Sequence, residues 1–311
     1  MSALIAGSMA YDTIMVFPDR FKHHILPEQV HILNVAFLVP ELRREYGGCA
    51  GNIAYNLKLL GGEPQILATV GKDFGPYADW LSSLGISRNH ITVRDDYYTA
   101  QAYITTDLDD NQITAFHPGA MSLAHETPAP SHAGIEIGLI SPDGKEGMLL
   151  HAEQFHQMGL PFIFDPGQGL PMFEGHDLLN LIEKADWVTL NDYEAKLMQD
   201  RTSCSIEDLA SRVKALIVTQ GGKGSIIHTA GKILEIPPAP VLKTADPTGC
   251  GDAYRAGLVY GLLEGHDLET TGRIASLMGA IKVESPGTQN HGFTRDGFRN
   301  RFKESFGYSL D

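Results

Sequence analysis

The sequence predicts an α/β protein in which a doubly wound, mostly parallel sheet carries helices on both faces, with a small separate β-sheet beside it. Two observations predict this fold class. Short apolar runs alternate with helical patterns, which is typical of parallel strands joined by right-handed crossovers. In addition, a chain of 311 residues with 43% hydrophobic content is long enough to bury one sizeable core.

The strands expected in the main sheet are short apolar runs that end at a glycine or a polar residue. They comprise residues 4–6, 65–70, 135–140, 161–164, 187–190 and 215–219. The proline-rich segment 236–240 is expected to be an extended connection. In doubly wound sheets ligands bind at the carboxyl ends of strands, so the residues that follow these runs are the first candidates for a functional site.

Two further segments do not fit the alternation of strands and helices. Val30–Val39 and the pair Gln101–Thr106 and Gln112–His117 have the pattern of antiparallel strands, and the pair is joined across a polar turn at 107–111. These segments predict the small separate sheet. A simple hairpin at the edge of the main sheet is the alternative.

The charge of the chain limits its partners. The formal net charge is −14, from 38 acidic and 24 basic residues, and no run of lysine and arginine interrupts the pattern. Binding to nucleic acid or to an anionic membrane surface is therefore not expected.

The cysteines and the absence of targeting signals indicate the compartment. The three cysteines (Cys49, Cys204 and Cys250) form no Cys-x-x-Cys pair, and no export signal or apolar run of about 20 residues is evident, so we expect a cytoplasmic protein.

The most informative stretch is 246–252, Asp-Pro-Thr-Gly-Cys-Gly-Asp, which leads into an apolar helical pattern. Small residues allow successive backbone N–H groups to face one concavity, and the positive end of a helix dipole favours an anion there. Asp252 would lie beside that anion, where a carboxylate can accept a proton from an attacking hydroxyl. Alternatively, Asp252 only complements the helix dipole and the glycines only form a tight turn.

This stretch resembles the C-terminal signature of the ribokinase or PfkB-type sugar and nucleoside kinases, Asp-Thr-x-Gly-Ala-Gly-Asp, with Pro247 and Cys250 at the two departures. Residues 47–52, Gly-Gly-Cys-Ala-Gly-Asn, resemble the N-terminal motif of the same family. The resemblance covers the whole chain. It implies one ribokinase-like core over residues 1–311 and a discontinuous lid, formed by about 13–46 and 96–118, that closes over the acceptor substrate.

The family resemblance also assigns roles at the acceptor side of the site. It implies that Asp252 is the general base and that the backbone of three small residues forms an anion hole: Gly249, Cys250 and Gly251. It places the hydroxyl groups of the acceptor near Asp12, Gly48 and Asn52, and a carboxylate and an amide are suited to vicinal hydroxyls. From the residues alone, Asn52 could instead cap a helix and Asp12 could be a plain turn residue.

The donor side has two candidate segments. Asn191 and Glu194 resemble the family's Asn-x-x-Glu motif, which implies that Glu194 orders water around a Mg²⁺ bound to ATP; the same pair also fits a capping box. Thr219, Gly221 and Gly224 resemble the family's nucleotide loop, although a hairpin turn explains them nearly as well. ATP and Mg²⁺ are the expected cofactors.

A monovalent cation is a further possibility. In the family the segment after the helix at 274–280 often borders a cation loop. Backbone carbonyls near four residues could supply such a site for K⁺: Asp246, Thr248, Ser285 and Gly287.

The substrate depends on the lid. Segments 26–40, 105–119 and 164–171 resemble the bacterial and archaeal nucleoside or adenosine kinases of the family. Three aromatic side chains could cover a flat base or could instead form the lid's own core: Phe37, Phe116 and His117. The turn at 165–168, which ends at Gln168, departs from the Asp-Pro-Asn-x-Arg pattern of several sugar kinases.

We therefore expect an ATP-dependent kinase that phosphorylates the 5′-hydroxyl of a ribonucleoside, with adenosine favoured. A ribokinase-like sugar kinase is the alternative, and a non-catalytic nucleoside- or sugar-binding protein on the same fold is a second one. Homodimerisation through the lid edges is expected by analogy. Other chemistries lack their motifs, because the sequence contains no P-loop, no dinucleotide fingerprint, no Gly-x-Ser-x-Gly elbow and no His-Glu-x-x-His pair.

Overall fold

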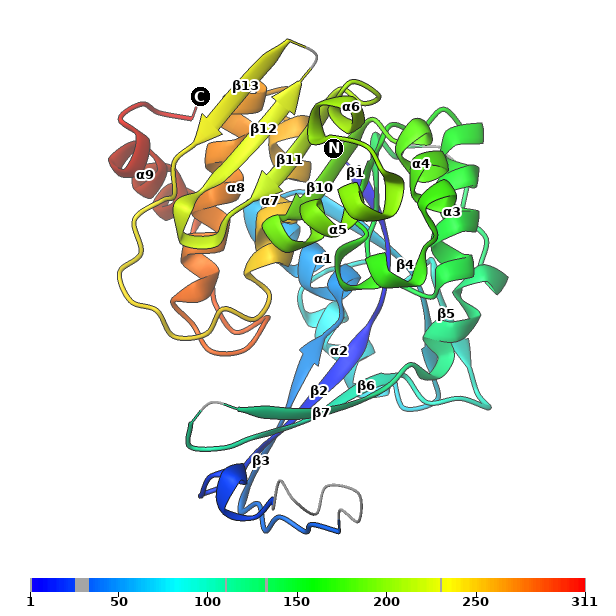
Figure 1. Ribbon diagram of the computed structural model, residues 1–311, viewed down its shortest axis with the longest axis vertical. Coiled ribbons are helices and arrows are strands. Elements are labelled where there is room, and N and C mark those ends of the chain that lie inside the picture. The colour runs from blue at the N-terminus through cyan, green and yellow to red at the C-terminus, as the bar shows by residue number, and fades with distance from the viewer. Residues whose placement is uncertain (1, 26–33, 110, 132–133, 230, 311) are drawn as a thin grey trace.

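The computed structural model describes residues 2–25, 34–109, 111–131, 134–229 and 231–310. Its main sheet has nine strands in the order β13-β12-β11-β10-β9-β8-β1-β4-β5 (Figure 1). The pairs from β11 to β5 are parallel, and β12 and β13 add an antiparallel hairpin at one edge. The strands are β1 (Ser2–Ala6), β4 (Glu63–Gly71), β5 (Ile91–Arg94), β8 (Ile137–Ile140), β9 (Phe162–Phe164), β10 (Trp187–Asn191), β11 (Ala215–Thr219), β12 (Ser225–Thr229) and β13 (Lys232–Ile236).

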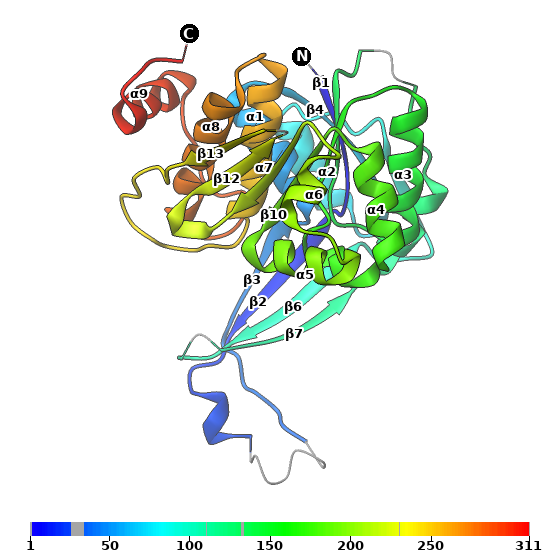
Figure 2. The ribbon, with the colours of Figure 1, turned by 45° about the horizontal axis from the view of Figure 1, so that its top comes forward.

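Helices cover both faces of this sheet, as Figure 2 shows, and the predicted doubly wound architecture is confirmed. One face packs against α1 (Cys49–Leu60), α2 (Gly75–Ser83), α7 (Cys250–Leu263) and α8 (Leu268–Val283). The other packs against α3 (Lys145–Gln157), α4 (Gly175–Lys184), α5 (Asp192–Thr202) and α6 (Ile206–Ala210). The last helix, α9 (Arg295–Phe306), packs onto α8 through Phe298 and Phe302.

The apolar runs of the sequence form these strands because both faces of the sheet are buried. Side chains alternate between the faces, so Ile5 joins the core beneath α1 and α7 whereas Leu4 joins the core beneath α3 and α4. In β9, Ile163 and Phe164 divide in the same way. The segment after β13 forms no regular element up to α7, as expected for the proline-rich connection. None of the helices within the described residues is long and apolar enough to cross a membrane.

A second, four-stranded sheet lies at one side of the core (Figure 2). We call it the small sheet, and its order is β3-β2-β6-β7, formed by β3 (Glu41–Gly47), β2 (Ala10–Val16), β6 (Ala100–Thr106) and β7 (Gln112–His117). β6 and β7 form the predicted antiparallel hairpin. Because β6 also pairs with β2, and β2 with β3, the hairpin belongs to a separate sheet and the edge-hairpin alternative is wrong.

The strand expected at Val30–Val39 is not found in the part that the structure describes. Residues 30–33 lie outside the described residues, 34–40 form no strand, and β3 begins at Glu41. Pro40 has no N–H to donate to a ladder, and β3 itself is charged because most of its residues face solvent. The apolar residue Phe37 packs instead against Phe17 and Phe21, with ring centroids 4.7 and 5.0 Å apart.

Candidate active site

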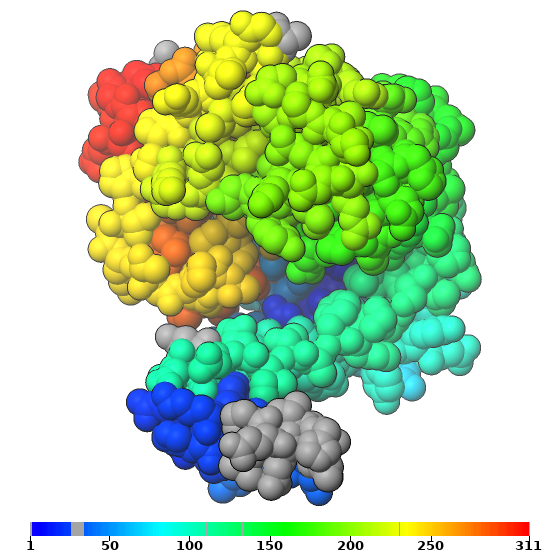
Figure 3. Space-filling model, viewed as in Figure 1, coloured from blue at the N-terminus to red at the C-terminus, as the bar shows by residue number. Residues whose placement is uncertain are grey.

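The largest cavity that involves the predicted residues lies between the main sheet and the small sheet. Figure 3 shows the hollow between the strands of the small sheet and the core. Its volume is about 780 Å³. Residues that follow β1, β8, β9 and β10 line it, together with the N-terminal turns of α1 and α7 and the inner face of β6 and β7. The cavity therefore lies at the carboxyl ends of the parallel strands, where the sequence predicted a site.

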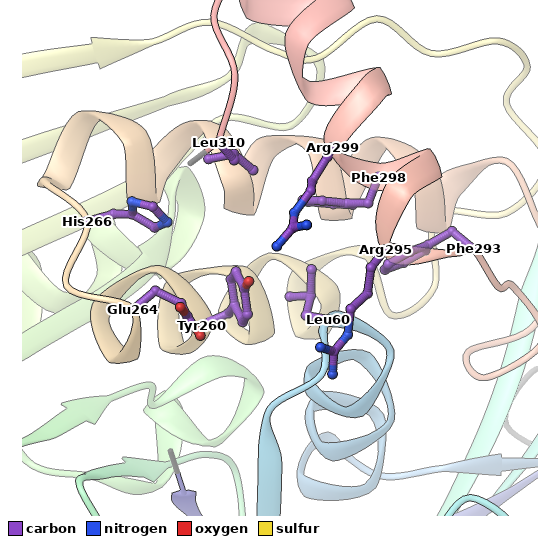
Figure 4. A pocket seen from close by; sticks show the side chains of 9 residues that line it. All are labelled: Leu60, Tyr260, Glu264, His266, Phe293, Arg295, Phe298, Arg299 and Leu310. Carbon is purple, nitrogen blue, oxygen red and sulfur yellow. The ribbon is translucent and has the colours of Figure 1, made fainter.

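A second pocket, shown in Figure 4, lies between α7, α9 and the end of α1, with Arg295 and Arg299 pointing into it. Its volume is about 40 Å³. A cavity of that size holds little more than water, whereas ligand sites are typically several hundred Å³. The cavity between the two sheets is of that size and is lined by Asp12, Asn52 and Asp252, so it is the candidate active site.

Gly48 fixes the start of α1 at the floor of the cavity. It is the N-cap residue with φ 84°, and a Cβ there would lie 2.6 Å from both the Ala10 nitrogen and the Ser8 carbonyl oxygen. Only glycine fits such a conformation at this distance. The Cys49 N–H donates to the Ser8 hydroxyl oxygen over 3.1 Å, so the first turn of α1 is held against the loop after β1.

Gly249 plays the same part for α7. It is the N-cap with φ 78°, and Asp252 lies in the first turn of the helix that follows. Gly249 and Gly251 line the cavity, as expected for an anion hole at a helix N-terminus. Cys250 is not among the lining residues: its N–H donates to the Pro247 carbonyl oxygen over 3.1 Å, and burial raises the pKa of its thiol to about 11.

Asp252 is held by Asn52. The Asn52 Nδ2 donates to Asp252 Oδ2 over 2.8 Å, and Gln289 Nε2 donates to Asn52 Oδ1 over 3.0 Å. Because the amide oxygen accepts from Gln289, the amide nitrogen faces the carboxylate. The helix-cap alternative for Asn52 is wrong, since Gly48 is the cap and Asn52 is an interior residue of α1 that is 4% exposed. Tyr77 and Trp80 hold Gln289 in turn.

The surroundings of Asp252 raise the pKa of its carboxyl group into the neutral range. Burial raises its pKa to about 7, the nearby Asp165 carboxylate acts in the same direction, and the Asn52 hydrogen bond and the Arg255 guanidinium oppose the shift. A carboxylate with a pKa near the working pH is well matched to accept a proton from an alcohol.

Arg255 and Asp165 form a buried ion pair that the sequence reasoning missed. Arg255 Nε and Nη2 donate to the two carboxylate oxygens of Asp165, each over 2.9 Å, and Glu194 Oε2 lies 3.8 Å from Nη2. The pair joins the end of β9 to α7 beneath the cavity. An available signal was the single arginine within the apolar pattern that follows Asp252, because a buried arginine needs a carboxylate partner.

Asp12 enters the cavity from β2, so it is a strand residue and the turn alternative is wrong. It lies over Gly47, where any side chain would overlap the Asp12 carboxylate. Burial and the neighbouring Glu45 raise the pKa of Asp12 to about 6.

Two further predicted acceptor residues also line the cavity. Phe116 lines it from β7, and Gln168 from the turn after β9. The other two lid aromatics, Phe37 and His117, are not among the described lining residues.

Asp143 also lines the cavity, and sequence reasoning did not single it out. It is 3% exposed; its Oδ1 accepts from the Gly144 N–H over 2.9 Å, and its Oδ2 has no hydrogen-bond partner among the described residues. Burial raises the pKa of this carboxyl to about 7. The rule that pointed to the carboxyl ends of strands could have found it, because it follows β8 closely.

Asn191 and Glu194 form the capping box at the start of α5. Asn191 Oδ1 accepts from the Glu194 N–H over 2.7 Å, and Glu194 Oε2 accepts from the Asn191 N–H over 2.8 Å. Both residues also line the cavity. Burial and the Asp165 carboxylate raise the pKa of Glu194, so a cation bound nearby would favour its charged form. Among the described residues, no group of three or more His, Cys, Asp or Glu side chains is arranged to hold a metal ion.

The predicted nucleotide-loop residues do not line this cavity, although Thr219 pairs with the lining residue Asn191. Thr219 ends β11, and Gly221 and Gly224 lie in the turn between β11 and β12, which pair antiparallel, so the segment is a hairpin turn. Gln220 N–H donates to the Gly224 carbonyl oxygen over 2.8 Å. None of the three predicted residues is among those that line the cavity, and their role toward ATP stays a prediction.

The residues expected around a monovalent cation lie close together, and the Lys282 side chain lies among them. The Asp246 carboxylate accepts from the N–H groups of Thr248 and Gly287, over 2.9 and 2.8 Å. The Lys282 ammonium lies between the carbonyl oxygens of Asp246 and Ser285, to which it donates over 2.9 and 3.1 Å. A lysine side chain therefore donates to two of the four carbonyls that we expected to bind K⁺.

A doubly wound core, a small sheet across its ligand crevice, and a carboxylate in the first turn of a glycine-capped helix together define a phosphotransferase of the ribokinase fold. The family model described as "pfkB family carbohydrate kinase" matches residues 8–294, and the chain belongs to that family. It is therefore an enzyme that uses ATP as a phosphoryl donor, and the alternative of a non-catalytic binding protein is not supported.

Two solved structures and one further sequence relative are similar to this chain. The nucleoside kinase of Burkholderia thailandensis in complex with inosine is 50% identical, with a TM-score of 0.90 over 99% of both chains. The nucleoside kinase of Methanocaldococcus jannaschii is 34% identical, with a TM-score of 0.89 over 97% of this chain and 98% of that one. The nucleoside kinase of Methanothermobacter thermautotrophicus is 31% identical over 98% of this chain and 96% of its own length.

Proposed function

We propose that this kinase transfers the γ-phosphoryl group of ATP to the 5′-hydroxyl of a ribonucleoside, with adenosine favoured. The single observation that carries the proposal is the cavity of about 780 Å³ that holds Asp252 together with an aromatic side chain of the small sheet, Phe116. Its size suits a nucleoside with the end of a triphosphate. The similarity to the B. thailandensis enzyme, whose structures contain inosine and ADP with inosine, supports a purine nucleoside as acceptor.

In this proposal the acceptor is held by carboxylates on both sides of the cavity. Asp12 from β2 and Asp143 after β8 accept hydrogen bonds from ribose hydroxyls, while Gly48 leaves room for the ring against the backbone, and Gln168 and Phe116 contact the rest of the nucleoside. Phe116 is 50% exposed and so offers a ring face that a base can cover. A free sugar would leave that face uncovered.

The reaction then follows from the position of Asp252. Its carboxylate accepts the proton of the 5′-hydroxyl as the oxygen attacks the γ-phosphorus, the bond from that phosphorus to the β,γ-bridging oxygen breaks, and ADP leaves. Asn52 keeps the carboxylate turned toward the acceptor. Gly249 and Gly251 at the N-terminus of α7, whose dipole favours negative charge, receive the charge that develops on the transferred group.

On the donor side we propose that ATP extends from this cavity toward Asn191 and the turn that contains Thr219, Gly221 and Gly224. The residues present fit a magnesium ion, because both oxygens of Glu194 already accept hydrogen bonds from Asn191 and could reach an ion through its water shell. When bound, Mg²⁺ would neutralise charge on the triphosphate.

We further propose that the small sheet, within the segments 13–46 and 96–118, acts as a lid, and that its edges support a homodimer. Every residue of β7 is exposed, and β7 is an edge strand with an unpaired side. Light scattering of the purified protein tests the dimer, and a mass of one chain at all concentrations would contradict it.

The test of the proposed function is a phosphotransfer assay over a panel of nucleosides and sugars, corrected for ATP hydrolysis. Adenosine, inosine and guanosine should show much higher kcat/KM than ribose or fructose, because only the nucleosides cover Phe116. Preferential turnover of ribose or fructose would instead support the ribokinase-like alternative and leave the kinase assignment intact.

A further inference from the structure

A fully buried lysine lies beneath the anion hole. Lys282, near the end of α8, is 0% exposed, which is rare for lysine unless its charge is satisfied. Its ammonium donates to the carbonyl oxygens of Asp246 and Ser285 over 2.9 and 3.1 Å. A neutral side chain would fill the same volume at a smaller desolvation cost. The presence of a buried charge therefore indicates that the charge has a role.

The two carbonyls belong to the segments that shape the N-terminus of α7. Asp246 opens the turn that leads to Gly249, and Ser285 belongs to the turn after α8. These turns are also joined directly, because the Gly287 N–H donates to the Asp246 carboxylate over 2.8 Å. The Lys282 ammonium therefore links the turn that begins at Asp246 to the turn after α8.

Lys282 also lies close to the anion hole itself. A Cβ placed on Gly249 would be 3.6 Å from Lys282 Cε. The positive charge is thus immediately behind the backbone that would hold the transferred phosphoryl group. Burial lowers the pKa of Lys282, and the neighbouring Cys250, Asp246 and Asp252 oppose that shift.

We propose that the Lys282 ammonium is a built-in cation of this kinase: it takes two carbonyls, those of Asp246 and Ser285, that would otherwise ligate a monovalent metal ion, it positions the turn that carries Gly249 and Gly251, and it makes catalysis independent of K⁺. Lys282 is a positioning residue, since its contacts are to backbone oxygens and not to the substrate. This proposal rests on the proposed kinase reaction only where kcat is measured. Its expected effects on melting temperature and on ADP affinity can be measured whether or not that reaction is correct.

The first arm of the test uses the natural protein. Its kcat, melting temperature and calorimetric ADP affinity are compared in KCl, NaCl and tetramethylammonium chloride at matched ionic strength, so that general screening is constant. All three quantities should agree, with kcat within about twofold. Activation by K⁺ of more than about fivefold, or a melting temperature that rises specifically with K⁺, would overturn the proposal.

The second arm compares two variants that differ in the space they leave. Lys282→Ala removes the charge and opens room for an ion, whereas Lys282→Met removes the charge and fills the space. In tetramethylammonium chloride both should lose about 10- to 100-fold in kcat, as expected when a preorganised charge is deleted. K⁺, NH₄⁺ or methylammonium should restore kcat and raise the melting temperature of Lys282→Ala only.

Full kcat of Lys282→Ala in tetramethylammonium chloride would contradict the proposal, as would equal rescue of both variants. If neither variant folds, the first arm decides alone. If neither nucleosides nor sugars are phosphorylated, the proposed function fails separately, because melting temperature and ADP affinity still report whether K⁺ acts on the natural protein.

Discussion

The Asn52 amide nitrogen lies 2.8 Å from the Asp252 carboxylate oxygen and donates a hydrogen bond to it, across a sequence separation of 200 residues. The bond joins the first turns of α1 and α7, which carry the two glycine motifs of the chain. Because Gln289 fixes the other end of the amide, Asn52 orients the carboxylate. The two motifs thus bring together the carboxylate of Asp252 and the amide that orients it.

Asp252→Asn tests the general base. The substitution keeps the size of the side chain and the helix start but removes the proton acceptor, so kcat should fall by about 10²- to 10⁴-fold while calorimetry still detects adenosine and ATP. Asp296→Asn is a matched control, because Asp296 is an exposed acid in the first turn of α9. It should leave kcat unchanged. A loss of less than about fivefold in Asp252→Asn would mean that Asp252 only complements the helix dipole.

The pKa of Asp252 also predicts the pH dependence of activity. Only the ionised carboxylate accepts a proton, and its pKa is about 7, so kcat/KM should rise about tenfold per pH unit below 7 and level off above it. A profile that is flat between pH 5.5 and 8, roughly one unit and more either side of that pKa, would contradict the assignment.

Stability of the ligand-free protein should change in the opposite direction. Folding raises the pKa of Asp252 above its ordinary value, so the folded state binds the proton more tightly than the unfolded state does. This contribution to stability is complete below the ordinary pKa of 3.8 and is lost as pH rises through about 7. Asp252→Asn should therefore gain stability relative to the natural protein between pH 5 and 8, roughly the window of this titration, as measured by melting temperature.

Asn52→Leu tests the orienting role of the amide. The hydrogen bond from Asn52 lowers the pKa of Asp252, so its removal should shift the inflection of the kcat/KM profile to higher pH and reduce activity most below that inflection. A loss of substrate affinity with an unmoved inflection would instead favour the interpretation of Asn52 as a direct ligand of an acceptor hydroxyl. Deoxynucleosides that lack one hydroxyl separate these outcomes, because a direct ligand loses less on such substrates in the variant.

The main sheet could be predicted from the sequence because strands buried on both faces are continuous apolar runs, as in β8 and β11. The small sheet could be predicted only in part. β6 and β7 are joined by a short polar turn and carry a local signal, whereas β3 is charged, exposed and defined by its pairing with β2. Pairing between distant segments leaves little trace in local composition.

The site residues were likewise predictable only in part. Asp252, Asn52 and Gly249 lie in glycine-rich stretches whose backbone chemistry is visible in the sequence. Asp165 and Arg255 lie 90 residues apart, and nothing local shows that they pair. The orientation of Lys282 toward backbone carbonyls is likewise a property of the folded chain, so the expectation of a K⁺ site could not anticipate it.

Phe116→Ala tests the lid side of the cavity. The substitution should raise KM for adenosine more than for ribose, because only the base covers the ring, and stacking on an aromatic side chain contributes about 1–3 kcal/mol per base. Ile113→Ala is the matched control: Ile113 is on the same strand, is 44% exposed, and does not line the cavity. Equal effects of the two substitutions would place Phe116 outside the nucleoside site.

Arg255→Met tests the ion pair beneath the cavity. The variant leaves the Asp165 carboxylate buried and unpaired, so the free energy of unfolding should fall by about 3–5 kcal/mol. Arg255→Met combined with Asp165→Leu should recover part of that loss, because no lone charge stays buried. Arg212→Met provides the comparison, since Arg212 pairs with Glu183 at the surface, where such pairs contribute about 0–1 kcal/mol. Denaturant midpoints measure all three variants, and additive losses in the double variant would show that the two side chains are not coupled.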